Sequence, residues 1–190
     1  MLKTVILVFI LATAVLQAAA QTTIFNIPSA DTQSRGSWGL EADFITKPVS
    51  YRDGGFQTYG YRVSYGLGNR TEVGTNFYLT KGLGDSTGQV EFSLKQNIYR
   101  NEKLGVSVSG GTVVFVPVRQ TNGDKTAIMV YGNASKIIEP LNGLTVTGGV
   151  YHVFRGNDFG TRTGVMAAAV QPIAKKFSFV ADWYSGQNRL

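Results

Sequence analysis

The chain has 190 residues, no cysteine and a formal net charge of +6. Without cysteine it can form no disulfide framework, no thiolate zinc cluster and no thiol nucleophile. Its positive charges are mixed with negative ones instead of forming a basic stripe, which argues against nucleic acid as a partner. Twenty-three glycines and only five prolines favour many strands and turns.

Residues 1–20 have the organisation of a signal peptide. Lys3 supplies a positive charge, residues 5–16 form an apolar core, and Ala18-Ala19-Ala20 fits the small-residue cleavage rule. The apolar run is shorter than the roughly 20 residues that a spanning helix needs, which favours cleavage over an uncleaved membrane anchor. We expect cleavage after Ala20, a polar periplasmic lead-in over residues 21–35, and one domain over residues 36–190.

The clearest predicted element is a β-hairpin between Phe56 and Leu79. Apolar and polar residues alternate along 58–65 and again along 72–79, so each strand has one apolar and one polar face. The turn at 66–70, Gly-Leu-Gly-Asn-Arg, contains residue types that tolerate positive φ. Its apolar face is rich in aromatics, while its polar face carries Arg62 and Glu72. This division suits a barrel that is apolar towards lipid and polar towards a lumen.

The same alternation predicts nine strands in all. They cover 36–47, two strands within 56–79, 89–99, 104–116, 126–136, 144–155, 163–171 and 177–184. The faces of 163–171 cannot be separated because 165–170 is apolar throughout, and Gly110-Gly111 predicts a bulge or sharp bend. Connections after the even-numbered predicted strands are short, and those after the odd-numbered ones are generally longer. This is the pattern of outer-membrane barrels, whose short turns are periplasmic.

Aromatic residues near the predicted strand ends, among them Trp38, Tyr99, Phe154 and Trp183, would form girdles at the two membrane interfaces. The alternative is cross-strand aromatic packing in a secreted β-sandwich or a lipocalin-like binder.

With these features the chain resembles bacterial outer-membrane β-barrel proteins of the small, porin-like or transporter-like kind. The resemblance lies in Ala18-Ala19-Ala20, the hairpin YGLGNRTEVGTNF and the strand spacing from Gly36 to Tyr184. It implies an all-β, antiparallel, up-and-down transmembrane β-barrel in the outer membrane. It also implies membrane lipid and the barrel-assembly machinery as partners.

The chain departs from that pattern in two respects. Bacterial single-chain barrels have an even number of strands and typically end in a strand with a terminal aromatic. Here the count is nine, and residues 186–190 are Gly-Gln-Asn-Arg-Leu. An open edge in lipid would leave backbone groups unpaired, so we expect at least one further strand after Leu190.

The sequence gives little support for a catalytic or a metal-binding site. His152, with Asp158 nearby in sequence, is the one candidate for a barrel enzyme, but no Gly-x-Ser-x-Gly motif accompanies it. The loop aspartates Asp53, Asp85 and Asp124 form no calcium-binding motif. We therefore expect no enzymatic activity and no cofactor.

The polar strand faces carry the candidate functional residues. An Arg or Lys facing lipid at the bilayer midplane would cost about 2–4 kcal/mol, so we assign these residues to the lumen. The candidates are Glu41, Asp43, Arg62, Glu72, Asn76, Glu91, Lys95 and Asn97. Because acidic and basic residues are mixed, we expect no strong ion selectivity. The pattern leaves open whether they line a pore or form a plug.

The expected function is a porin-like passive channel for small solutes. The alternatives are a non-channel barrel that serves structure or adhesion through its outer loops, a barrel enzyme, and a secreted β-sandwich binder.

Overall fold

The structure, a computed structural model, describes residues 23–24, 27–82, 87–118, 125–155, 161–175 and 177–185. The predicted signal peptide, the loop residues Asp85, Asp124 and Asp158, and residues 186–190 lie outside these ranges. No helix in the described part of the chain is long and apolar enough to cross a membrane.

Nine strands form one antiparallel sheet in which neighbours in sequence are neighbours in space. They are β3 Trp38–Lys47, β4 Phe56–Gly68, β5 Thr71–Lys81, β6 Thr87–Asn101, β7 Val106–Pro117, β8 Ala127–Ile138, β9 Leu144–Arg155, β10 Thr163–Ala174 and β11 Phe177–Tyr184. Two short 3-10 turns, η1 (Tyr51–Asp53) and η2 (Glu139–Leu141), lie in connections. The predicted all-β, up-and-down, antiparallel architecture is confirmed, and the bounds of β9 and β11 match the predicted ranges.

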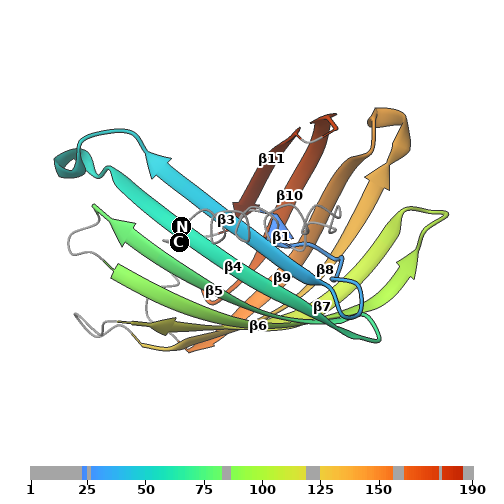
Figure 1. Cartoon of the computed structure of the whole chain (residues 1–190), viewed down its shortest axis with the longest axis horizontal. Helices are drawn as coiled ribbons and strands as arrows, with labels where there is room; N and C mark the ends of the chain where they lie inside the picture. Colours follow the sequence, from blue (N-terminus) through green and yellow to red (C-terminus); the bar gives the residue numbers. More distant parts are fainter. Residues whose placement is uncertain are drawn as a thin grey trace, which may run out of the picture.

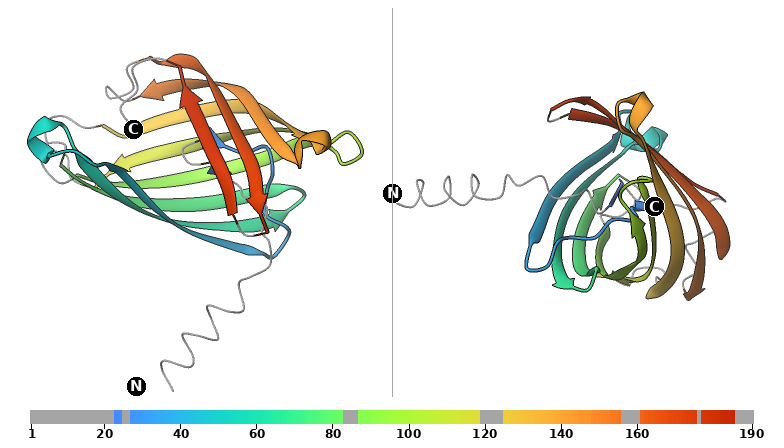
Figure 2. Two further views of the ribbon diagram at one scale, coloured as in Figure 1. Left: turned by 90° about the horizontal axis from the view of Figure 1, so that it is seen from above. Right: turned by 90° about the vertical axis from the view of Figure 1, so that its right-hand side faces the viewer.

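The sheet curls into a half-barrel (Figure 1). Within the described residues its edges are β3 and β11. A second, two-stranded sheet pairs β1 (Thr23–Ile24) with β2 (Ile27–Pro28). Figure 2 shows the large sheet curving around this blue N-terminal pair, so the concave face encloses the beginning of the described chain.

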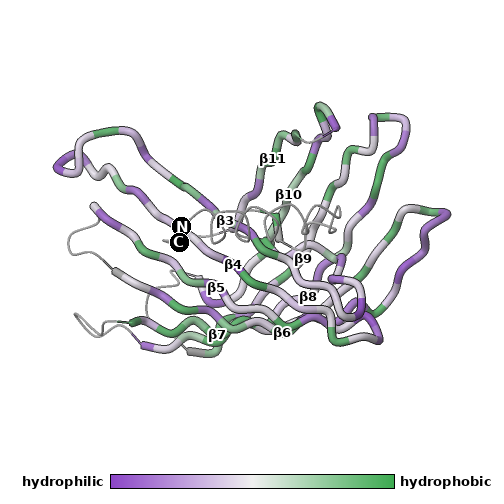
Figure 3. Tube along the Cα trace, in the orientation of Figure 1, coloured by the Kyte–Doolittle hydropathy of each residue, from purple (hydrophilic) through white to green (hydrophobic). Residues whose placement is uncertain are grey.

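Over β4 to β6 the two faces of the sheet have the reverse of the polarity found in a soluble protein. In β4, Tyr61 is 56% exposed on the convex face, whereas its neighbour Arg62 is 5% exposed on the concave face. Figure 3 shows this alternation as changes between green and purple along the strands. Strand periodicity therefore sends aromatic and aliphatic side chains outward and many charged side chains inward.

The connections follow the predicted alternation of short turns and longer loops. Those after β4 and β10 span only 69–70 and 175–176, whereas those after β3 and β7 span 48–55 and 118–126. In the first of these turns Asn69 and Arg70 have φ of 49° and 58°, as a tight hairpin turn requires.

The predicted bulge at Gly110-Gly111 is wrong in its position. Pairing of β7 with both neighbours runs through these glycines without a shift, and the irregularity lies on β6 between Asn97 and Tyr99. Gly111 instead makes room for a neighbour, since a Cβ built on it would lie 2.5 Å from Tyr131 Oη.

Candidate functional site

The concave face is crossed by the N-terminal segment (residues 23–24 and 27–36), which we expected to be a lead-in to the sheet. Its contacts with β8 and β6 use mainly its backbone. Asn133 Nδ2 donates to the Pro28 carbonyl, and the Ala30 amide donates to Ser135 Oγ at 3.3 Å. Asn97 Nδ2 donates to the Ala30 carbonyl at 2.8 Å. Buried polar side chains of the sheet thus pair with backbone groups of the segment.

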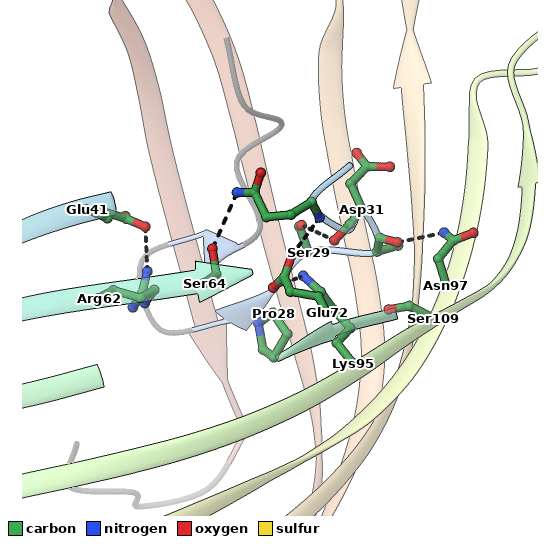
Figure 4. A network of polar contacts seen from close by, with 12 residues as sticks. Pro28, Ser29, Asp31, Glu41, Arg62, Ser64, Glu72, Lys95, Asn97 and Ser109 are labelled. Carbon is green, nitrogen blue, oxygen red and sulfur yellow. Dashed lines mark hydrogen bonds and ion pairs between the residues drawn. The ribbon is translucent and has the colours of Figure 1, made fainter. Parts of the chain in front are cut away.

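Further along, the segment reaches β7, β5 and β4. Ser107 Oγ donates to Asp31 Oδ1 at 3.2 Å, and the Gln33 amide donates to Glu72 Oε2 at 2.7 Å. Gln33 Nε2 also donates to Ser64 Oγ at 3.4 Å. Figure 4 shows Ser64, Glu72 and Asn97 reaching towards this segment from different strands. The segment is therefore an integral part of the concave face.

Glu72 connects the segment to a buried ion pair. Its Oε1 lies 3.4 Å from Lys95 Nζ, while its Oε2 accepts from the Gln33 amide. Glu72 and Lys95 are direct partners in the pairing of β5 with β6, so the sheet places their Cβ atoms about 5 Å apart. One carboxylate thus neutralises a buried ammonium and holds the N-terminal segment.

A second network centres on Arg62. Glu41, Arg62, Asn76 and Glu91 form one row of direct cross-strand partners over β3 to β6. Arg62 Nη1 lies 2.8 Å from Glu41 Oε2, and Arg62 Nε donates to Asn76 Oδ1 at 3.1 Å. Asn76 Nδ2 donates to Glu91 Oε2 at 2.7 Å, and Arg62 Nη2 donates to Tyr78 Oη at 2.8 Å. The antiparallel register of β3 to β6 therefore places residues that are far apart in sequence side by side in one continuous polar row.

All the candidate residues lie on the concave face. Asp43 belongs to the Arg62 network, since its Oδ2 lies 3.7 Å from Arg62 Nη2. The candidates are brought together as two groups, namely Glu41, Asp43, Arg62, Asn76 and Glu91, and separately Glu72, Lys95 and Asn97 with the N-terminal segment. Four carboxylates face two cations in this set. Their role in lining a pore stays a prediction.

The apolar half of the concave face was not anticipated from the sequence. Over part of β7 to β10 the inward side chains form a buried apolar cluster, and Ile24 and Ile27 pack into it. The other buried inward side chains of β7 to β9 are polar, namely Ser107, Ser109, Asn133, Ser135 and Thr147. The sheet members of the cluster are Val113, Phe115, Ala127, Met129, Tyr131, Tyr151, Val153, Met166 and Ala168. The runs 113–116 and 165–170, apolar on both strand faces, were the signal for it.

His152 lies apart from these groups, near the end of β9. Its Nδ1 is 2.6 Å from Thr163 Oγ1, and its ring meets that of Phe154 edge-on at 4.7 Å. In the described ranges no group of three His, Cys, Asp or Glu residues could hold a metal ion.

No family model, no curated protein and no solved structure matches this chain. The fold and the concave face therefore carry the functional argument.

Proposed function

We propose that this protein is an outer-membrane β-barrel that lets small solutes pass through a polar lumen. The observation that carries the proposal is the polarity of the sheet, with buried charges on the concave face of β4 to β6 and large apolar side chains exposed on the convex face. Apolar surface exposed to water is unfavourable by roughly 25 cal/mol per Å², so a convex face of this kind calls for a lipid environment.

The dimensions and aromatic placement of the strands support a membrane location. The strands run from 8 residues in β11 to 15 in β6, and a tilted strand crosses the hydrocarbon core with about 9–11. Trp38 packs against Tyr65 and Phe44 against Tyr59, at ring distances of 4.6 and 5.2 Å. Trp38 and Phe44 are both exposed on the convex face, where aromatic side chains suit the outward surface of a membrane barrel.

Passage would run along the polar half of the concave face. The Arg62 and Glu72 networks would filter solutes by size and charge. The proposal includes export with cleavage after Ala20, contact with outer-membrane lipid and insertion by the barrel-assembly machinery. It assigns no catalysis to His152 and no role to nucleic acid.

Fractionation of cells that express the intact gene tests the membrane location. We expect the protein in the outer-membrane fraction, with gel migration that shifts on boiling, and a salt conductance after reconstitution into planar bilayers. A soluble periplasmic product without a heat shift would refute the proposal and favour a secreted β-sandwich binder.

A second candidate is a closed barrel that acts through its outer loops. The N-terminal segment favours it, because this segment and its bonded side chains occupy the concave face. Membrane insertion without conductance, both in the intact protein and in a variant lacking residues 23–28, would select this alternative.

A further inference from the structure

The concave face has two chemically different halves. The polar half carries the ion pairs over β3 to β6 and continues over one end of β7 to β9. The buried polar side chains at that end are Ser107, Ser109, Asn133, Ser135 and Thr147. The apolar half occupies the rest of β7 to β10, with buried side chains such as Met129, Val153 and Met166. A water-filled outer-membrane channel has a polar interior. Passage of small polar solutes therefore does not account for the apolar half.

The N-terminal segment contacts both halves, with its apolar residues on the apolar half and its hydrogen-bonding residues on the polar half. Ile24 and Ile27, which are 2% and 0% exposed, pack into the apolar cluster. Ala30 and Gln33 then bond to the polar half through Ser135, Asn97 and Glu72. The segment is thus an elongated amphiphile in its own right, with an apolar end and a hydrogen-bonding end.

A solute that takes the place of this segment when the passage opens must make favourable contacts with both the apolar and the polar half of the concave face. A polar solute would leave the apolar half facing water, which is unfavourable in proportion to its area and favours local dewetting. An alkyl chain would take the place of the two isoleucines. Asn97 and Asn133 donate to the segment's carbonyl groups, so a head group bearing oxygen acceptors would suit the polar half.

We propose that the solutes of this passage are elongated amphiphiles with an alkyl tail and an oxygen-bearing head group. The N-terminal segment occupies their place and must move aside for them. This inference rests on the proposed function, because it names the class of solute that the lumen admits.

The absence of cysteine allows the segment to be locked by a single engineered link. Asp31 Oδ1 and Ser107 Oγ are 3.2 Å apart, so D31C/S107C places one thiol on the segment and one on β7. The control, V106C/K136C, joins direct partners of β7 and β8 on the convex face and leaves the segment unlinked. The full-length variants would be reconstituted into liposomes with a photoreactive medium-chain alkyl carboxylate, and the labelled residues would be mapped by mass spectrometry.

We expect the reduced D31C/S107C protein to be labelled on concave residues such as Val153 and Met166, and this labelling to be lost on oxidation and restored by reduction. The control should be labelled there in both states. Lipid-dissolved probe labels the convex face throughout and serves as the internal reference. Labelling confined to the convex face, or concave labelling that persists with the segment locked, would overturn the inference.

Two further measurements separate this inference from the proposed function. Ile27→Ala weakens the apolar anchor without touching an ion pair and should increase concave labelling, while Ile98→Ala on the convex face should not.

Salt conductance is recorded on the same preparations. Conductance without concave labelling retains the passage and refutes the amphiphile. Concave labelling without conductance supports the amphiphile site and refutes passage.

Discussion

At the scale of single residues, the contact between Glu72 and Lys95 is a buried ion pair on the concave face. Their charged groups lie 3.4 Å apart with side chains only 6% and 4% exposed. Glu72→Gln removes the anion beside a buried ammonium, and we expect it to lower the free energy of unfolding by about 3–5 kcal/mol. Urea titration of the protein folded in liposomes measures this change.

The matched control is Glu102→Gln. Glu102 pairs with Arg100 at 3.5 Å, but the two side chains are 80% and 46% exposed. Solvent screening leaves such a pair worth about 0–1 kcal/mol. Equal effects at Glu72 and Glu102 would show that Lys95 is not held in a dry environment by Glu72.

Glycines on the concave face leave room for neighbouring tyrosine rings. A Cβ on Gly111 would lie 2.5 Å from both Tyr131 Oη and the Leu94 carbonyl oxygen, so Gly111→Ala must displace a ring or the backbone. We expect it to destabilise the fold by about 1–3 kcal/mol, as overpacking does. Gly148, on the convex face of β9, has nothing within 4 Å of such a Cβ. Gly148→Ala should therefore change stability by less than about 0.5 kcal/mol in the same titration.

At the scale of elements, the β1–β2 pair is anchored by very few side chains. Ile27 is fully buried in the apolar cluster, and Ile27→Ala should lower stability by about 2–5 kcal/mol. The backbone amides of Ala30 and Gln33 donate hydrogen bonds to side chains of the sheet. When Ile27→Ala loosens the segment, these two amides should exchange hydrogen faster, while the amides of β6 to β9 keep their protection. Exchange measured by mass spectrometry tests this. A parallel loss of protection in β6 to β9 would show that the segment and the sheet unfold as one unit.

The strands were predictable because side-chain direction in a strand depends only on parity. Alternation at Tyr61 and Arg62 sufficed to assign opposite faces, and the Asn69-Arg70 turn was evident from residue types alone. In β10 alternation failed at 165–170, since Met166 and Ala168 pack into the apolar cluster while the opposite face is also apolar.

The N-terminal segment was not predictable by the same means. Its burial depends on partners far away in sequence, such as Ser135 for Ala30, which is 105 residues distant. A short segment with Pro28 and no sustained period carries no local signal of such contacts. The two polar groups of the concave face were likewise assigned to one side by parity, but only the pairing register shows which charges meet.

At the scale of the whole molecule, arginine substitutions on the convex face can distinguish lipid from water as the surroundings of that face. Val150 lies near the middle of β9 and is 58% exposed, and Ile173 lies at the end of β10 and is 71% exposed. If lipid surrounds this face, Val150→Arg should cost about 2–4 kcal/mol and Ile173→Arg only about 0–1 kcal/mol, because the penalty falls from the bilayer midplane to its interfaces.

Water around the convex face would give a different result, since an exposed arginine in water changes stability by about 0.5 kcal/mol or less at either site. Urea titrations of both variants in liposomes of one composition therefore compare an exposed apolar position in the middle of a strand with one at a strand end, at the irregularity between Pro172 and Ala174. A large penalty at Val150 with a small one at Ile173 would support a membrane-spanning sheet. Small and equal effects would mean that water surrounds the apolar convex face, and the barrel proposal would fall with it.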